Sequence, residues 1–152
     1  MIRHVDEGLG YLALQGTRPA TVSYAIEDSP TGLLAWIAEK FEEWGDLGHE
    51  GLSRTLPPDR LLANVTAYWL DRNAVAAAHL LYDARHADRD WGAQPRAPQG
   101  WAVFGGGGGV VRQLIDPQHE ISHWTEYPEG GHFAALEAPE SFVNDVRTFF
   151  RR

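Results

Sequence analysis

The chain has 152 residues, of which 43% are hydrophobic and 11% aromatic, a composition typical of one globular domain. Acidic residues outnumber basic ones by 21 to 13, and the net charge of −8 argues against a nucleic-acid partner. The sequence has no cysteine, which excludes disulfides and thiolate metal sites, and it shows neither a signal-type apolar segment nor a run of about 18 apolar residues. We therefore expect a cytoplasmic protein with no membrane partner.

The N-terminal part of the sequence predicts helices. Arg18 precedes a proline, which disfavours helix at that position and marks a boundary, so we expect a short helix that starts at Pro19 or Thr21 and ends at about Glu27. Ser29 followed by Pro30 is typical of a helix start, with an N-cap and a proline in the first turn. The helix that follows carries an apolar stripe with Trp36 and Trp44, which we interpret as packing residues.

Two further helices are expected before residue 86. The run Pro57-Pro58-Asp59 predicts a helix start, and apolar residues recur at helical spacing up to residue 70. A break over residues 71–73 separates it from a helix over residues 74–85. Asp46, in the sequence GDLG, is not interpreted as a nucleophile, because a charged helix precedes it instead of the buried strand that a nucleophile elbow requires.

Strands are expected in the C-terminal part, after a Pro- and Gly-rich linker over residues 86–100. Residues 101–104 form an apolar run typical of a buried strand in a parallel sheet. The glycine run at 105–109 lacks the Lys-Ser or Lys-Thr of a phosphate loop, so we do not expect nucleotide binding. A short helix over residues 110–114 should end at Asp116-Pro117, and a strand is expected over residues 121–127.

His132 follows two glycines, between that strand and an amphipathic helix expected over residues 139–150. Glycines let the backbone turn sharply and approach other groups closely, so the imidazole can project from the loop at the end of the strand. Catalytic histidines of doubly wound hydrolases are mounted in this way. His119 and His123 lie nearby, but spacings of four and nine across a strand do not build a ligand set, so we expect no metal site, and no organic cofactor is implied.

Several separated segments, in the same order, resemble the C-terminal half of microsomal-type epoxide hydrolases of the α/β-hydrolase superfamily. They are QGTRP at 15–19, DSPTGLLAWI at 28–37, YW at 68–69 and GGHFAALE at 130–137. The resemblance implies a partial α/β-hydrolase fold. Residues 1–96 would form a mostly helical lid, and residues 97–152 would supply the last two core strands and the C-terminal helix.

The resemblance also implies a chemistry. In that family an aspartate attacks an epoxide carbon and forms an ester, while two lid tyrosines donate hydrogen bonds to the epoxide oxygen. A histidine held by a carboxylate then activates the water that hydrolyses the ester to a vicinal diol. Tyr11 and Tyr82 match the two tyrosines, and His132 matches the histidine. The implied substrate is a small hydrophobic epoxide.

The sequence departs from the family pattern in two ways. The acid partner of the histidine belongs to a Phe-Pro-x-Asp/Glu pattern, but Gly107 occupies its position, which leaves Asp116 or Glu120 as substitutes from a shifted loop. Met1 also falls inside the family's lid, so the nucleophilic aspartate and the earlier core strands are expected outside this chain. We therefore expect the isolated chain to be inactive, or to need a partner half or a second copy.

Two alternatives stay open at this point. The chain could be the back half of another α/β-hydrolase, such as an esterase or a haloalkane dehalogenase. It could also be a non-catalytic interaction protein that binds a partner through the aromatic surface of the lid.

Overall fold

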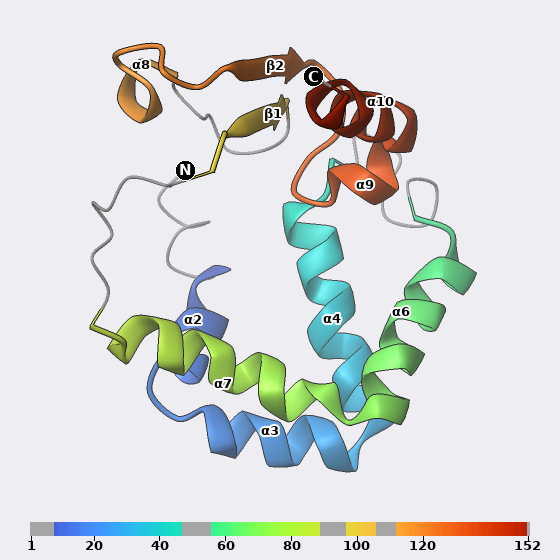
Figure 1. The fold of residues 1–152 in the computed structure, drawn as a ribbon. Coiled ribbons are helices and arrows are strands. Elements are labelled where there is room, and N and C mark those ends of the chain that lie inside the picture. Colours follow the sequence, from blue (N-terminus) through green and yellow to red (C-terminus); the bar gives the residue numbers. More distant parts are fainter. Residues whose placement is uncertain (1–7, 47–55, 89–96, 106–111, 152) are drawn as a thin grey trace. The chain divides into compact units, whose positions relative to one another are not determined.

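A computed structural model of the chain describes residues 8–46, 56–88, 97–105 and 112–151. They fall into two compact units. The N-terminal unit comprises Met1–Glu43 and Pro58–Trp91, and the C-terminal unit comprises Trp44–Pro57 and Gly92–Arg152. In the described parts, strands occur only in the C-terminal unit (Figure 1). This mixture of several helices and one small sheet agrees with the partial α/β fold that was predicted.

The N-terminal unit is helical, and four of its helices start at or next to the residues that the sequence predicted. Its elements are α2 (Gly10–Gln15), α3 (Pro19–Asp28), α4 (Pro30–Trp44), α6 (Pro58–Asp71) and α7 (Asn73–His86). The N-cap at Ser29 is confirmed, because its hydroxyl oxygen accepts the Gly32 N–H at 3.0 Å. The predicted break between α6 and α7 is Arg72, which has a left-handed φ of 52°. The six-residue helix α2 was not predicted from the sequence.

The core of the N-terminal unit is built from apolar residues of α3, α4, α6 and α7. Helix α3 packs along α7, as Figure 1 shows. Leu33 of α4 is only 1% exposed, and Trp36 packs against the buried cluster, which confirms its interpretation as a packing residue. The buried members of the cluster are Val22, Ile26, Leu33, Val65, Ala74 and Ala78.

The C-terminal unit contains a two-stranded parallel sheet. Strand β1 (Gly100–Phe104) pairs with β2 (His123–Tyr127), so that Gly100 lies opposite His123 and Phe104 opposite Tyr127. Three helices complete the unit: α8 (Arg112–Ile115), α9 (Ala134–Glu137) and α10 (Pro139–Phe150). The two predicted strands and the helix from residue 139 are thus confirmed, although β2 starts two residues later than expected, whereas the one-turn helix α9 was not predicted.

Helix α10 is fixed to the sheet by aromatic contacts and one buried carboxylate. Phe149 contacts the His123 ring, with centroids 5.6 Å apart. Asp145 lies on the same helix and is only 6% exposed. Its two carboxylate oxygens each lie 3.0 Å from a partner on β2: Oδ2 from Nε2 of His123, and Oδ1 from the hydroxyl that Tyr127 donates. Thr125 adds a side-chain hydrogen bond, and the three partners share one face of β2 because alternate residues of a strand do.

The pKa of Asp145 is displaced by two opposing causes. Burial raises the pKa of this carboxyl, but the hydrogen bonds from His123, Thr125 and Tyr127 outweigh burial, so the pKa lies below its ordinary value. The pKa of Tyr127 is raised, first by burial and then by the neighbouring Asp145 carboxylate. Both directions favour an ionised Asp145 and a neutral Tyr127 in the folded chain.

No helix within residues 8–46, 56–88, 97–105 and 112–151 is long and apolar enough to cross a membrane. Residues 106–111, which include most of the glycine run and Gly107, lie outside the described residues.

We expect Ser29→Ala to lower the free energy of unfolding of the N-terminal unit by about 1 kcal/mol, because the Gly32 N–H loses its acceptor. Urea denaturation followed by circular dichroism at the helix signal measures this change. Ser29→Asp, which keeps an acceptor at the N-cap, should retain the stability. An equal loss in both variants would contradict the capping role.

We expect Asp145→Asn to lower the free energy of unfolding at neutral pH by about 1–3 kcal/mol, because the buried donors of β2 lose a charged acceptor. The folded pKa of Asp145 is below the unfolded value of about 4, so the group stabilises the fold above that pH and the contribution is lost as pH falls through the folded pKa.

Urea denaturation at a series of pH values from about 3 to 7 tests this prediction. In Asp145→Asn the free energy of unfolding should fall less steeply towards acid pH than in the parent chain. Asp83→Asn, at an exposed position of α7, should leave the pH dependence unchanged. If the free energy of unfolding of Asp145→Asn fell with the same slope as in the parent chain, the link between the ionisation of Asp145 and stability would be contradicted.

Candidate functional site

The loop after β2 carries His132, and glycine makes its path possible. Gly130 has a φ of 77°, which L side chains rarely adopt. A Cβ atom there would also lie 3.0 Å from the Phe104 ring and 3.3 Å from the Cβ of Ala138. The chain therefore turns tightly against the end of β1, and the next residues run straight into the one-turn helix α9.

His132 is exposed at the tip of this turn, as the sequence predicted for a projecting histidine. Its backbone N–H donates to the Trp44 carbonyl at 3.3 Å. Its ring lies 5.0 Å from the Trp44 ring and 5.0 Å from the Phe133 ring, measured between centroids. Trp44 therefore supports the imidazole, a role more specific than the general packing predicted for it.

A hollow of about 250 Å³ borders the imidazole. Its lining is mostly apolar and combines β1, the glycine turn and two helices: Ala102, Val103, Phe104, Gly131, His132, Ala134 and Phe142. An imidazole at the rim of an apolar hollow can take a proton from a water molecule that attacks a substrate held there. This arrangement suits general-base chemistry.

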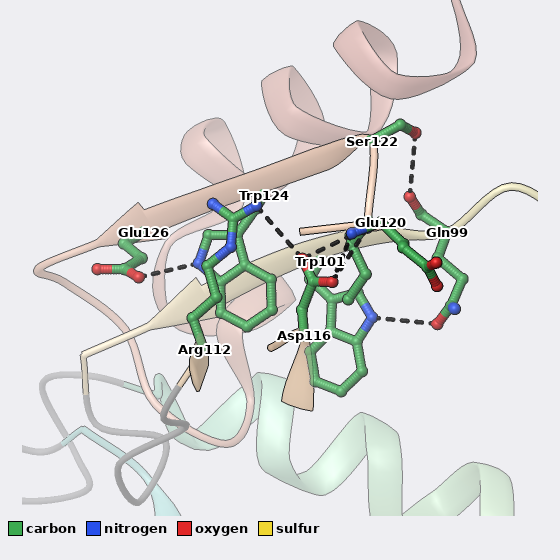
Figure 2. A network of polar contacts seen from close by, with 9 residues as sticks. Gln99, Trp101, Arg112, Asp116, Glu120, Ser122, Trp124 and Glu126 are labelled. Atoms are coloured by element: carbon green, nitrogen blue, oxygen red, sulfur yellow. Dashed lines mark hydrogen bonds and ion pairs between the residues drawn. The ribbon is translucent and has the colours of Figure 1, made fainter. Parts of the chain in front are cut away.

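The carboxylate partner of the histidine is not supplied by Asp116. That side chain is 4% exposed and accepts the backbone N–H of Glu120 at 2.7 Å and of Ile121 at 3.3–3.4 Å. It also pairs with the Arg112 guanidinium at 3.4 Å, in the network that Figure 2 shows. Burial raises the pKa of Asp116, but the two amides and Arg112 outweigh it and keep the pKa low. Asp116 thus closes the loop that leads into β2.

The network around Asp116 extends to the opposite face of the sheet from α10. Trp101 and Trp124, neighbours in the strand register, stack with centroids 5.6 Å apart and planes at 11°. The Arg112 guanidinium lies 4.9 Å from the Trp124 ring centroid, and the Trp124 indole donates to Glu126 (Figure 2). The side chain of Glu120, the other candidate acid, is exposed.

In the part of the chain that the structure describes, no carboxylate hydrogen-bonds the His132 imidazole. No group of three or more His, Asp or Glu side chains in that part could hold a metal ion. His123, whose spacing from His119 and His132 was not expected to build a metal-ligand set, is paired with Asp145. The position of Gly107, where the resemblance places the acid, is outside the described residues.

The two predicted tyrosines belong to the N-terminal unit. Tyr11 lies on α2, and the ammonium of Lys40 is 4.7 Å from its ring centroid. Burial lowers the pKa of Lys40, but hydrogen bonds to Glu39 and Glu43 outweigh it, so the pKa is raised and the cation persists. Tyr82 lies on α7 and stacks on the His86 ring at 4.1 Å.

The sequence missed two carboxylates that shape the neighbourhood of His132. Asp145 holds β2 through the alternate residues His123, Thr125 and Tyr127, and its only sequence signal is its position three and four residues from the inward-facing Phe142 and Phe149. Glu137 accepts hydrogen bonds from Gly131 and Asp46, and no local pattern indicates the second of these contacts.

No protein-family model matches the chain. The chain is 37% identical over 153 residues to a Stigmatella aurantiaca protein whose name assigns it to the epoxide hydrolases, a match that covers 95% of this chain. It is 33% identical over 158 residues to epoxide hydrolase 1 of Sus scrofa, covering 92% of this chain. In both cases the chain spans 33% of the relative's length.

Solved structures give the same result. The juvenile hormone epoxide hydrolase of Bombyx mori matches with a TM-score of 0.81 and 31% identity, over 94% of this chain and 39% of that structure. The Aspergillus niger epoxide hydrolase matches with a TM-score of 0.75 and 29% identity, over 99% of this chain and 37% of that structure. The matched region is the C-terminal part of these proteins.

Proposed function

Because this chain belongs to the epoxide hydrolase family, as a C-terminal portion of its α/β-hydrolase fold, we propose that it supplies the water-activating half of an epoxide-to-diol reaction. The chain spans about a third of the length of the curated relatives it matches. The nucleophilic aspartate that the resemblance implies belongs to the remaining part of the fold. Activity is therefore proposed for the chain joined to that part.

One observation carries the proposal. His132 projects from a glycine turn after a parallel strand and borders an apolar hollow, with Trp44 behind its ring. In the proposed reaction the carboxylate of the aspartate displaces the epoxide oxygen from carbon and forms an ester. His132 then takes a proton from water as the water oxygen adds to the ester carbonyl carbon. The bond from that carbon to the diol oxygen breaks, and His132 returns the proton to this oxygen as the diol leaves.

We propose Tyr11 and Tyr82 as the donors to the epoxide oxygen. A phenol can donate a hydrogen bond to the alkoxide that develops as the ring opens. The Lys40 ammonium lies over the Tyr11 ring and the His86 ring stacks on Tyr82, so each ring is supported within the N-terminal unit. The lid role of residues 1–96, the cytoplasmic location and a partner half or second copy remain predictions from the sequence.

A non-catalytic role is the second candidate, and one observation favours it. No carboxylate in the described residues contacts the His132 imidazole, and Asp116 is engaged by two amides and Arg112. Loss of the carboxylate that orients a catalytic histidine costs about 10⁴ in turnover in serine proteases. A chain with that loss could keep the fold and bind a partner without turnover.

The test joins this chain to the N-terminal two thirds of the Stigmatella aurantiaca relative and measures diol formation from a small hydrophobic epoxide. We expect His132→Asn to stop turnover while the ester still forms, because ring opening does not need the histidine. Mass spectrometry should then show the aspartate peptide heavier by the mass of one epoxide.

The matched control is His119→Asn, which changes an exposed histidine of the same unit. It should turn over like the parent. Full diol formation by His132→Asn would refute the assignment of His132, and a joined parent that neither opens epoxides nor forms the ester would favour the non-catalytic role.

We expect the double change Tyr11→Phe with Tyr82→Phe to slow ring opening by roughly 10²–10³ or more, because the developing alkoxide loses both donors. In contrast to His132→Asn, no ester should accumulate in this variant. Tyr24→Phe, at a position that is 75% exposed, controls for the loss of a hydroxyl. Undiminished diol formation in the double variant would exclude the proposed role of the two phenols.

A further inference from the structure

We propose that Glu137 is a positioning residue for His132, which clamps the glycine turn to residues 44–46. The clamp is a structural inference. Its consequence for catalysis rests on the proposed function of His132.

The clamp consists of one carboxylate with two backbone donors. Oε2 of Glu137 accepts the Gly131 N–H at 2.7 Å, and Oε1 accepts the Asp46 N–H at 2.6 Å. The two donors come from segments that are distant in sequence, since Asp46 and Glu137 are 91 residues apart. Hydrogen bonds from an N–H to a carboxylate are shorter and stronger than neutral ones. One side chain therefore ties the residue before His132 to a distant segment.

A second hydrogen bond joins the same two segments. The His132 N–H donates to the Trp44 carbonyl at 3.3 Å, and the imidazole centroid lies 5.0 Å from that of the Trp44 ring. Consecutive amides, those of Gly131 and His132, are thus both anchored. The histidine backbone is fixed on one side by Glu137 and on the other by Trp44.

Gly131 is needed for this approach. A Cβ atom at Gly131 would lie 2.8 Å from the Asp46 nitrogen, a distance that real Cβ atoms essentially never show. Gly131 is buried, so its N–H would lose its hydrogen-bond partner without Glu137. The close approach of the Gly131 and Asp46 backbones and the hydrogen bonds of both amides to Glu137 therefore belong to the same clamp.

The one-turn helix α9 brings Glu137 back to its own loop. The N–H groups of Leu136 and Glu137 both donate to the Phe133 carbonyl, at 2.8 and 3.1 Å, and Ala138 donates to Ala134 at 2.8 Å. This turn places the Glu137 side chain beside Gly131, six residues earlier. The function of α9 is therefore to aim a carboxylate at the turn that precedes it.

Correct placement of the imidazole matters for only one step of the proposed reaction. A general base must lie within about 3 Å of the water that it deprotonates, and a displacement of about 1 Å can cost about 10²-fold in rate. Ring opening by the aspartate does not use His132. Weakening the clamp should therefore slow ester hydrolysis and leave ester formation unchanged.

The first test is hydrogen exchange of single amides, by NMR, in the 152-residue chain itself. Glu137→Ala should accelerate exchange at both Gly131 and Asp46 by roughly 10-fold or more, and should leave the amide of Ala138 unchanged. Glu137→Gln keeps the side-chain length but offers one acceptor oxygen, so it should release one of the two amides. Glu140→Gln, at an exposed position of α10, should release neither.

The clamp is refuted if the same amide, either that of Gly131 or that of Asp46, exchanges at the parent rate in both Glu137→Gln and Glu137→Ala. It is also refuted if Ala138 is released to the same extent in Glu137→Gln, because Glu137 would then only stabilise α9.

The second test uses the joined enzyme described above. Glu137→Gln should slow ester hydrolysis about 10-fold or more with no change in the rate of ester formation, so that the ester accumulates during turnover. Equal slowing of both steps would assign Glu137 a general structural role and overturn its positioning role. An inactive parent enzyme would count against the proposed function, and hydrogen exchange would still decide the clamp.

Discussion

The C-terminal unit depends on a buried carboxylate that cannot be left without donors. Two strands alone make at best a marginal sheet in water, so β1 and β2 need a covered face. Helix α10 covers it, and Asp145 at its centre collects the side chains of His123, Thr125 and Tyr127. A buried carboxylate is costly unless it is hydrogen-bonded, which makes this contact selective for one alignment of α10 on β2. The direction in which β2 ends, and hence the start of the glycine turn, follows from that alignment.

Three acidic side chains in this unit serve as acceptors for the chain's own donors. Asp116 closes the loop before β2, Asp145 holds β2 itself, and Glu137 holds the turn after β2. The segments that they hold follow one another along the chain, from the loop before β2 to the turn that carries His132, so that each part of this path has a hydrogen-bonded fixed point. His132 at the end of this path is exposed, while its backbone N–H donates to the Trp44 carbonyl. A histidine with a held backbone and a solvent-exposed ring is suited to proton transfer at the rim of a hollow.

Structural features that depend on residues adjacent in the chain were predicted well from the sequence. Helix starts at Pro30, Pro58 and Pro139 depend on proline and on N-cap chemistry, which are local, and the structure confirms these three, while it places the start that was left open between Pro19 and Thr21 at Pro19. The short helices α2 and α9 were missed because one or two turns carry too little apolar periodicity to read. The hydrogen-bond partners of Glu137 and Asp145 could not be predicted from the sequence, since a carboxylate in an amphipathic segment is usually solvated. The resemblance, by contrast, joined distant segments, and the comparisons confirmed the family that it named.

Within the described residues each strand of the small sheet has one neighbour, so both β1 and β2 are edges. Each outer side presents a row of backbone N–H and C=O groups in extended geometry, which is a template for the addition of another strand. A whole α/β-hydrolase sheet would bury at least one of these rows. In the described residues, these outer rows are therefore the places where a further strand of the fold can pair with the small sheet.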